Sequence, residues 1–205
     1  MSQFPTLKDL SRRALFIARW DVLIERPERG FPTSLDEVVF RPGAIDALFY
    51  AGQAGWQLYL FGDEPQVPDG KQSYAQWQAI EAGILDRLRA QGVKITRSYA
   101  AVDRVGGVEG HDKESVYATP NTGVMHHARQ NDGINLDDSW VVAADVESLI
   151  SGWRAGCSTA GVALPRIARS GRLQPRTTCA PTATRLSATA TAVSSSSPAI
   201  TSARL

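Results

Sequence analysis

The chain has 205 residues, of which 43% are hydrophobic and 21% charged, a balance typical of a globular protein with one domain-sized core. Its net charge of +1 conceals an uneven distribution, because residues 1–147 carry 15 Lys and Arg against 21 Asp and Glu, whereas residues 148–205 carry seven Arg and no acidic residue. No run approaches the roughly 18 apolar residues of a membrane span, and the first residues lack the apolar stretch of a signal peptide, so we expect a cytoplasmic protein with no membrane partner.

The first part of the chain alternates short apolar runs with a segment of helical periodicity. We expect a buried strand over residues 14–18 and a second strand over residues 56–61. Between them, Pro42 can open a helix that ends by Gly52 or Gly55. The apolar side of this helix is predicted to consist of Ile45, Leu48 and Phe49.

A capped helix is predicted next. Ser73, followed three residues later by Gln76, has the spacing of a capping box, and Gly92 marks the end of the helix. A third strand follows over residues 94–99, and the Gly- and charge-rich residues 100–118 predict a long loop. One face of the helix is predicted to carry Trp77, Ile80, Ile84 and Leu88.

Two further helices and two further strands complete the pattern. Asn121 or Thr122 can cap the first helix, and the second ends at Gly156. The strands are predicted over residues 139–143 and 159–164. The predicted apolar faces are Val124, Met125 and Ala128 in the first helix and Val146, Leu149, Ile150 and Trp153 in the second.

This alternation predicts an α/β fold over residues 1–164, with a Rossmann-like parallel sheet of about five strands, helices on both faces and no large cap domain. From residue 165 onward, 26 of 41 residues are Ser, Thr, Ala or Pro and none is aromatic. Such a segment cannot bury enough apolar surface to offset its chain entropy. We therefore expect residues 165–205 to be a disordered tail, or else a C-terminus read out of its native frame.

The tail and the cysteines limit the function classes further. Six arginines in residues 165–205 raise a basic-tailed nucleic-acid binder as an alternative function, but the block is dilute and no aromatic residue interleaves with it, so we expect no nucleic-acid partner. The two cysteines, Cys157 and Cys179, exclude a disulfide scaffold and a four-thiolate zinc site.

Four stretches of the sequence resemble, in order and content, the haloacid-dehalogenase superfamily, and most closely its histidinol-phosphate and heptose-bisphosphate phosphatase branch. They are ALFIARWDVLIE (14–25), RPGAIDALFYAGQAGWQLYLFGDE (41–64), TPNTGVM (119–125) and SWVVAADVESLISGWRAGC (139–157). The resemblance spans nearly all of the predicted domain. It implies a haloacid-dehalogenase-like fold and an origin among phosphomonoester hydrolases.

The family's chemistry requires particular atoms at the carboxyl ends of the strands, where ligands of parallel sheets bind. An aspartate attacks phosphorus, and a second one, two residues on, protonates the leaving oxygen. A Thr or Ser and a Lys hold the phosphoryl oxygens, and carboxylates after the fourth strand hold Mg²⁺. By the resemblance these positions fall, in the same order, on Ala18, Trp20, Phe61, Thr119 and Ala144, with a further metal carboxylate at Ser148.

None of these residues carries the atom that its role requires. The leading hypothesis is therefore a phosphatase-like protein that has lost phosphoryl transfer, with binding or no retained function, no catalytic residue and no cofactor. Its partner would be a protein or a small phosphorylated ligand. Trp20 and Phe61 then fill the former phosphate site as local core or, in a second interpretation, form an aromatic contact for a partner.

The alternative is a divergent Mg²⁺-dependent sugar-phosphate phosphatase whose carboxylates have shifted along the loops. Asp21, Asp63 and Asp145 are its candidate metal ligands, because each lies close to a lost position at a predicted strand end. A simpler interpretation makes them caps and solubilising charges, with Asp145 at the positive end of the last helix. A one-residue slip would also turn Asp21 to the face opposite a nucleophile.

Overall fold

The computed structural model describes residues 12–162, and the predictions for residues 163–205, which include Cys179, lie outside this range. Strands and helices alternate along the described residues as expected. In chain order the elements are β1 (Ala14–Ala18), the 3₁₀ helix η2 (Leu35–Glu37), α1 (Ala44–Gln53), β2 (Gln57–Asp63), α2 (Tyr74–Ala90), β3 (Ile95–Ala101), α3 (Gly123–Asp132), β4 (Trp140–Ala143), α4 (Val146–Arg154) and β5 (Ser158–Gly161).

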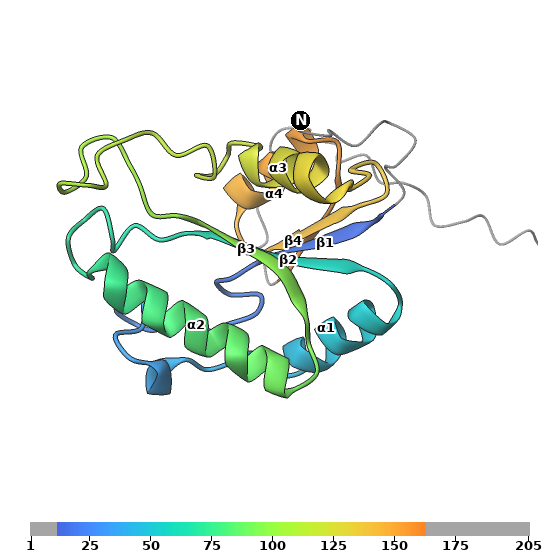
Figure 1. The fold of residues 1–205 in the computed structure, drawn as a ribbon, viewed down its shortest axis with the longest axis horizontal. Coiled ribbons are helices and arrows are strands. Elements are labelled where there is room, and N and C mark those ends of the chain that lie inside the picture. The colour runs from blue at the N-terminus through green and yellow to red at the C-terminus, as the bar shows by residue number, and fades with distance from the viewer. Residues whose placement is uncertain (1–11, 163–205) are drawn as a thin grey trace, which may run out of the picture.

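The five strands form one parallel sheet in the order β3-β2-β1-β4-β5. Since parallel neighbours need crossover connections, each helix lies on a face of the sheet. Figure 1 shows α1 and α2 on one side of the sheet and α3 and α4 on the other. This confirms the predicted α/β architecture, and residues 12–162 contain no large cap domain between these elements.

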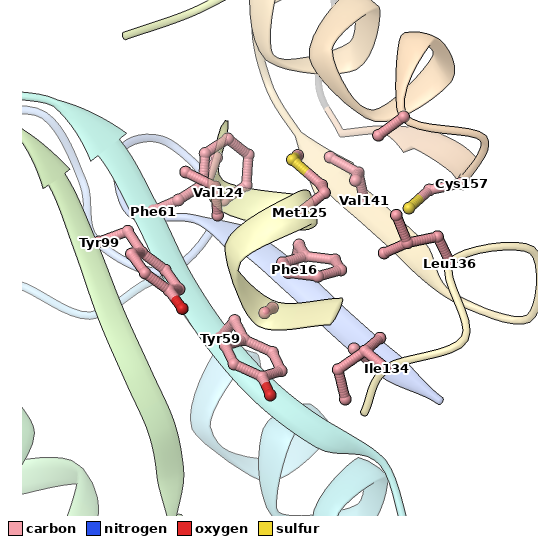
Figure 2. Packing of buried hydrophobic residues seen from close by; sticks show 14 of the residues in the cluster. Phe16, Tyr59, Phe61, Tyr99, Val124, Met125, Ile134, Leu136, Val141 and Cys157 are labelled. Atoms are coloured by element: carbon pink, nitrogen blue, oxygen red, sulfur yellow. The ribbon is translucent and has the colours of Figure 1, made fainter. Parts of the chain in front are cut away.

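Each face of the sheet has its own hydrophobic cluster, because alternate residues of a strand point to opposite sides. On the α3 and α4 side, Phe16 of β1 stacks on Tyr59 of β2 with ring centroids 5.0 Å apart, and Met125 of α3 packs in the same cluster (Figure 2). On the α1 and α2 side, the cluster contains Ile17 of β1 and Ile84 of α2. The central strand β1 is therefore buried on both faces.

The capping signals position the second helix as predicted. The Ser73 side chain accepts a hydrogen bond from the backbone N–H of Gln76, and the Gln76 side chain accepts one from the backbone N–H of Ser73, which completes the capping box. Gly92, just beyond the last turn, has a φ of 77°, a value that L side chains rarely adopt. The helix therefore begins and ends at the sequence signals.

The last helix approaches the sheet through small residues beside the predicted apolar stripe. From that stripe Leu149 packs against the core cluster and Trp153 is 53% exposed, whereas the buried residues of the helix are Ser148, Ser151 and Gly152. A Cβ built on Gly152 would lie 2.5 Å from a methyl carbon of Val141 in β4. Only small side chains allow the helix to approach the sheet this closely, so the apolar stripe does not identify the buried face.

In residues 12–162, no helix is long and apolar enough to cross a membrane.

The close approach of α4 predicts that Gly152→Ala destabilises the protein by about 1–3 kcal/mol, because the added methyl overpacks the contact with Val141. Gly52→Ala in α1 is the matched control: its Cβ would meet Leu58 at an ordinary 3.8 Å, and Ala favours a helix by about 0.5–1 kcal/mol over Gly. Urea unfolding of both variants measures the difference. Equal effects of the two substitutions would contradict this packing.

Candidate functional site

The carboxyl end of the central strand carries no reactive group. Ala18 is the last residue of β1 and pairs in register with Phe61 of β2. Both side chains are buried, at 4% and 1% exposure, in the cluster that also contains Ala143 at the end of β4. Methyl groups and an aromatic ring thus fill the face of the edge where the resemblance implies a nucleophile and a phosphate contact.

Trp20 and Phe61 are both buried, but they do not fill a common space. Trp20 packs with Ile17 and Ile80 on the α1 and α2 side, whereas Phe61 packs with Tyr99 on the α3 and α4 side. Continued strand alternation would place Trp20 on the face of Ala18 and Phe61, so their separation follows from the end of β1 at Ala18, after which the chain leaves the extended conformation. At 6% and 1% exposure, both are core side chains.

Thr119 and Asp63 contact each other at this edge. The Thr119 backbone N–H donates to Asp63 Oδ1 over 3.1 Å, and the Thr119 hydroxyl donates to Asp63 Oδ2 over 2.5 Å. The peptide bond from Thr119 to Pro120 is cis. Thr119 stands where the resemblance implies a lysine. Its two hydrogen-bond donors, the backbone N–H and the hydroxyl, are both bound to the Asp63 carboxylate at the end of β2.

The Asp63 carboxyl group has an altered acidity. Burial raises its pKa above the usual value of Asp, and the negative charges of Asp145 and Glu147 raise it further, while the hydrogen bonds from Thr119 act in the opposite direction. We call Asp63, Asp145 and Glu147 the acidic group, because the charges of Asp145 and Glu147, at the start of α4, act on Asp63 at the end of β2.

Asp145 and Ser148 cap the last helix. Asp145 Oδ1 accepts a hydrogen bond of 2.7 Å from the backbone N–H of Ser148, and its carboxylate lies at the positive end of α4. Ala144, where the resemblance implies a metal carboxylate, directly precedes this cap and ends in a methyl group. The predicted capping role of Asp145 is present in the structure.

Asp21 lies away from this group. The chain turns after Trp20, with the Asp21 backbone N–H donating to the carbonyl of Ile24 and a φ of 63° at Asp21 itself. Its carboxylate pairs at 3.2 Å with the exposed side chain of Arg26. Within residues 12–162 no three His, Cys, Asp or Glu side chains are arranged to hold a metal ion. Asp21, Asp63 and Asp145 are therefore not gathered into a cation site.

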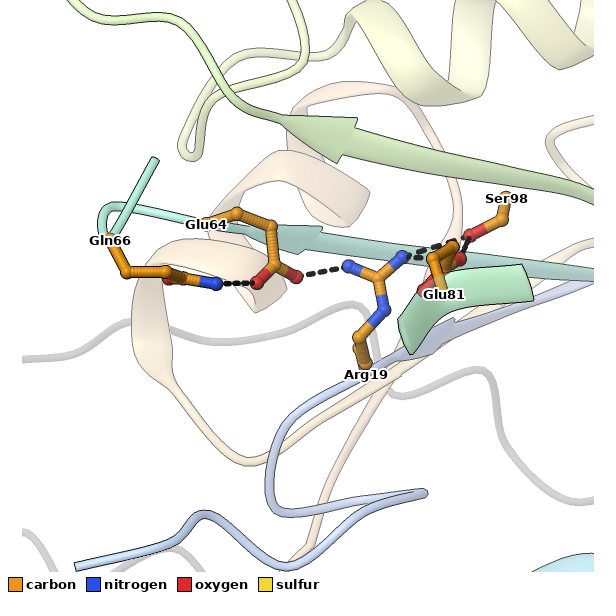
Figure 3. A network of polar contacts seen from close by, with 5 residues as sticks. All are labelled: Arg19, Glu64, Gln66, Glu81 and Ser98. Carbon is orange, nitrogen blue, oxygen red and sulfur yellow. Dashed lines mark hydrogen bonds and ion pairs between the residues drawn. The ribbon is translucent and has the colours of Figure 1, made fainter. Parts of the chain in front are cut away.

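A buried charged network, which the sequence interpretation missed, lies on the opposite face of the same edge (Figure 3). Arg19 follows β1 and is 1% exposed; it pairs with Glu64 after β2 and, at 2.9 Å, with Glu81 of α2. Ser98 of β3 bonds to both Arg19 and Glu81. The Gln66 side chain donates to the second oxygen of Glu64 over 2.7 Å.

The electrostatics of the network keep the guanidinium charged. Burial by itself lowers the pKa of Arg19, but Glu81 and Glu64 outweigh it and raise that pKa above the ordinary value. One sequence signal pointed to this network: Glu81 lies four residues after Trp77 and three before Ile84, so it interrupts the apolar face of α2. A carboxylate at such a position requires a buried partner.

A cavity of about 450 Å³ lies at the opposite, amino-terminal edge of the sheet. Its described lining comes from the end of α1, the first residue of β2 and the approach to β3, and includes Phe49, Trp56, Val93 and Lys94. The lining contains no Asp, Glu, His or Cys. Lys94 is the one ionisable side chain among these lining residues, so the cavity offers no carboxylate, imidazole or thiol to act with it.

No family model matches the sequence. A curated relative, D-glycero-β-D-manno-heptose-1,7-bisphosphate 7-phosphatase from Mesorhizobium japonicum, is 24% identical over 144 residues, which make up 70% of this chain and 65% of the relative. This chain thus spans slightly less than two thirds of the length of that enzyme.

Solved structures share the fold. A candidate HAD-like phosphatase from Mesorhizobium loti superposes with a TM-score of 0.66 at 23% identity, over 77% of this chain and 73% of that one. The D,D-heptose 1,7-bisphosphate phosphatase from B. bronchiseptica, solved with magnesium and phosphate, gives 0.62 at 20% identity, over 72% and 78%. These findings confirm the predicted fold and the predicted likeness to haloacid-dehalogenase-type and heptose-bisphosphate phosphatases.

The acidic group predicts opposite pKa changes in two variants. Thr119→Val removes a hydroxyl that stabilises the Asp63 carboxylate, so the pKa of Asp63 rises further; Asp145→Asn removes a like charge and keeps a capping oxygen, so that pKa falls. NMR titration of the carboxyl carbon of Asp63 measures both. Since native Asp63 keeps its proton to a higher pH than the unfolded chain, its contribution to stability decreases as the pH rises through that interval. Parallel changes in the two variants would contradict this arrangement.

The buried network predicts a large effect of Arg19→Met. The substitution leaves Glu64 and Glu81 buried without their counter-charge and destabilises the protein by about 3–5 kcal/mol. Arg26→Met, which breaks the exposed pair with Asp21, costs about 0–1 kcal/mol. Chemical denaturation of the two variants compares the pairs, and a cost for Arg19→Met as small as that for Arg26→Met would show that the buried pairing is not needed.

Proposed function

We propose that this chain is a phosphatase-fold protein that has lost phosphoryl transfer and retains a binding role at most. The observation that carries the proposal is Ala18, a buried methyl group at the end of the central strand. By the resemblance, the reaction begins with the attack of a carboxylate oxygen from this position on phosphorus. Removing the nucleophile from a covalent mechanism typically lowers turnover by about 10⁶.

The other positions support the same proposal. The indole of Trp20 cannot act as a general acid at useful acidity, and it is buried on the far side of the sheet from Ala18. Phe61 presents a ring, and the Thr119 donors are bound to Asp63. Because the lost groups act as one unit, no single remaining group restores the reaction.

Charge at the edge also opposes a phosphate ligand. Asp63, Asp145 and Glu147 interact there and share a negative field. A phosphate monoester carries negative charge as well, so like charges oppose its approach unless a cation lies between them. The residues do not fit Mg²⁺ at this place, because within residues 12–162 no three His, Cys, Asp or Glu side chains are arranged to hold a metal ion. The charge at this edge therefore disfavours a small phosphorylated ligand.

A second candidate is a divergent Mg²⁺-dependent sugar-phosphate phosphatase. The observation in its favour is the proximity of Asp63 to Asp145 and Glu147, together with the heptose-bisphosphate phosphatases among the similar proteins. In this chain, Asp63 and Asp145 would be the candidate Mg²⁺ ligands. A water molecule would have to act as the nucleophile, because the side chain of Ala18 cannot. The activity assay separates the two candidates.

The proposal predicts no turnover above the blank when the full chain is incubated with Mg²⁺ and a panel of sugar bisphosphates, sugar monophosphates and a generic aryl phosphate. Released phosphate is measured at high enzyme concentration, so that a rate about 10⁶ below that of an ordinary phosphatase is distinguished from none.

The controls are carboxylate variants. Asp63→Asn and Asp145→Asn remove the two candidate ligands, and Asp86→Asn removes an exposed carboxylate of α2 that pairs with Arg89. Mg²⁺-dependent turnover that survives in Asp86→Asn and disappears in Asp63→Asn or Asp145→Asn would overturn the proposal in favour of the second candidate.

A further inference from the structure

A small cavity lined by polar and apolar side chains lies beneath Arg19, between the end of β1, the loop after β2 and helix α2. We call it the Arg19 chamber. Its volume is about 10 Å³, which is on the scale of a single water molecule. It is lined by Arg19, Trp20, Pro32, Glu64, Gln66, Gln72, Trp77, Ile80, Glu81 and Ile84.

Four buried side-chain atoms of this lining have no hydrogen-bond partner within the part of the chain that the structure describes. They are Arg19 Nε, Trp20 Nε1, Gln72 Oε1 and Glu81 Oε2. Each belongs to a residue that is at most 8% exposed. Leaving such a group unpaired costs about 1–3 kcal/mol, and all four residues line the same cavity, so one partner placed there can serve several of them.

The four atoms define what that partner is. Arg19 Nε and Trp20 Nε1 are N–H donors, whereas Glu81 Oε2 and Gln72 Oε1 are acceptors. A water molecule accepts two hydrogen bonds and donates two, which matches this set atom for atom. A metal cation or ammonium would face two N–H donors, and an anion would face the carboxylates of Glu64 and Glu81.

We propose that the Arg19 chamber is a binding site for a single long-lived water molecule, which accepts from Arg19 and Trp20 and donates to Gln72 and Glu81. A volume of this size fits a water molecule better than a larger ligand. The water completes the buried network, because one oxygen of Glu81 bonds to Arg19 and Ser98 while the other, Oε2, has no partner among the described residues.

The site also gives a role to Trp20. By the resemblance this position belongs to a general acid. Here the Trp20 ring packs in the cluster on the α1 and α2 side, and its N–H has no partner among the described residues, so it is available to the water. Gln72 has a related double role, since its amide nitrogen donates to the carbonyl of Pro32 over 2.8 Å while its oxygen lines the chamber. Pro32 thereby closes the chamber from the loop before η2.

The wild-type full chain provides the first test. A crystal structure at high resolution is expected to show one ordered water within about 3.2 Å of at least three of the four atoms. In solution, the indole N–H of Trp20 is expected to show a water cross-peak from a molecule with a long residence time, and Trp20→Phe assigns that signal by removing it. Direct bonds of the four atoms to protein groups, or an indole N–H of Trp20 without a water cross-peak, would overturn the proposal.

Two matched variants provide the second test. Trp20→Phe keeps the ring and deletes the N–H that faces the chamber, so the unfolding equilibrium constant is expected to rise roughly fivefold, the factor of one net hydrogen bond. Trp77→Phe makes the same change in the same lining, but the Trp77 nitrogen is not among the unpaired buried atoms, so a smaller effect is expected. Equal effects of the two variants would count against the site.

Discussion

A buried guanidinium must be matched by carboxylates, and this constraint organises the carboxyl-terminal half of the sheet. Arg19 is 1% exposed, and an unpaired charge at such a depth is far too costly for a folded domain. Its partners come from the loop after β2 and from α2, and Ser98 adds a contact from β3. Three neighbouring strands and a helix are thus fixed around one charge.

The two faces of this edge have different roles. On the α1 and α2 side, Arg19, Glu64 and Glu81 form ion pairs with one another and stabilise the fold. On the α3 and α4 side, Ala18 and Phe61 continue the hydrophobic cluster up to the edge. Stability and register at this edge therefore do not depend on the positions that the resemblance assigns to catalysis, which explains how the fold persists when those positions change.

The sequence predicted the fold well and the charged network poorly, for physical reasons. Strands and helix ends are local: the apolar run before Arg19, the capping box at Ser73 and the left-handed Gly92 each act within a few residues. The buried face of α4 depends instead on the fit of Gly152 against Val141, for which small side chains give no hydrophobic signal. The pairing of Arg19 with Glu81 joins residues far apart in the chain. The one sequence signal that indicates it is the position of Glu81 within an apolar stripe of α2. At the candidate site, the sequence predicted the cap at Asp145 but not the turn that carries Asp21 away.

The burial of Ala18 makes the change at this position hard to reverse. An aspartate there would place a new negative charge in a niche formed with Phe61 and Ala143, close in the sheet to a strand that already ends in Asp63. Such a charge is tolerated only with a cation or a donor beside it, and Ala144 offers neither. Reversion would thus need several coordinated substitutions, each harmful or useless by itself. Under the proposed function, the methyl group is in evolutionary terms a step that is hard to retrace, because regaining hydrolysis would require all of these substitutions together.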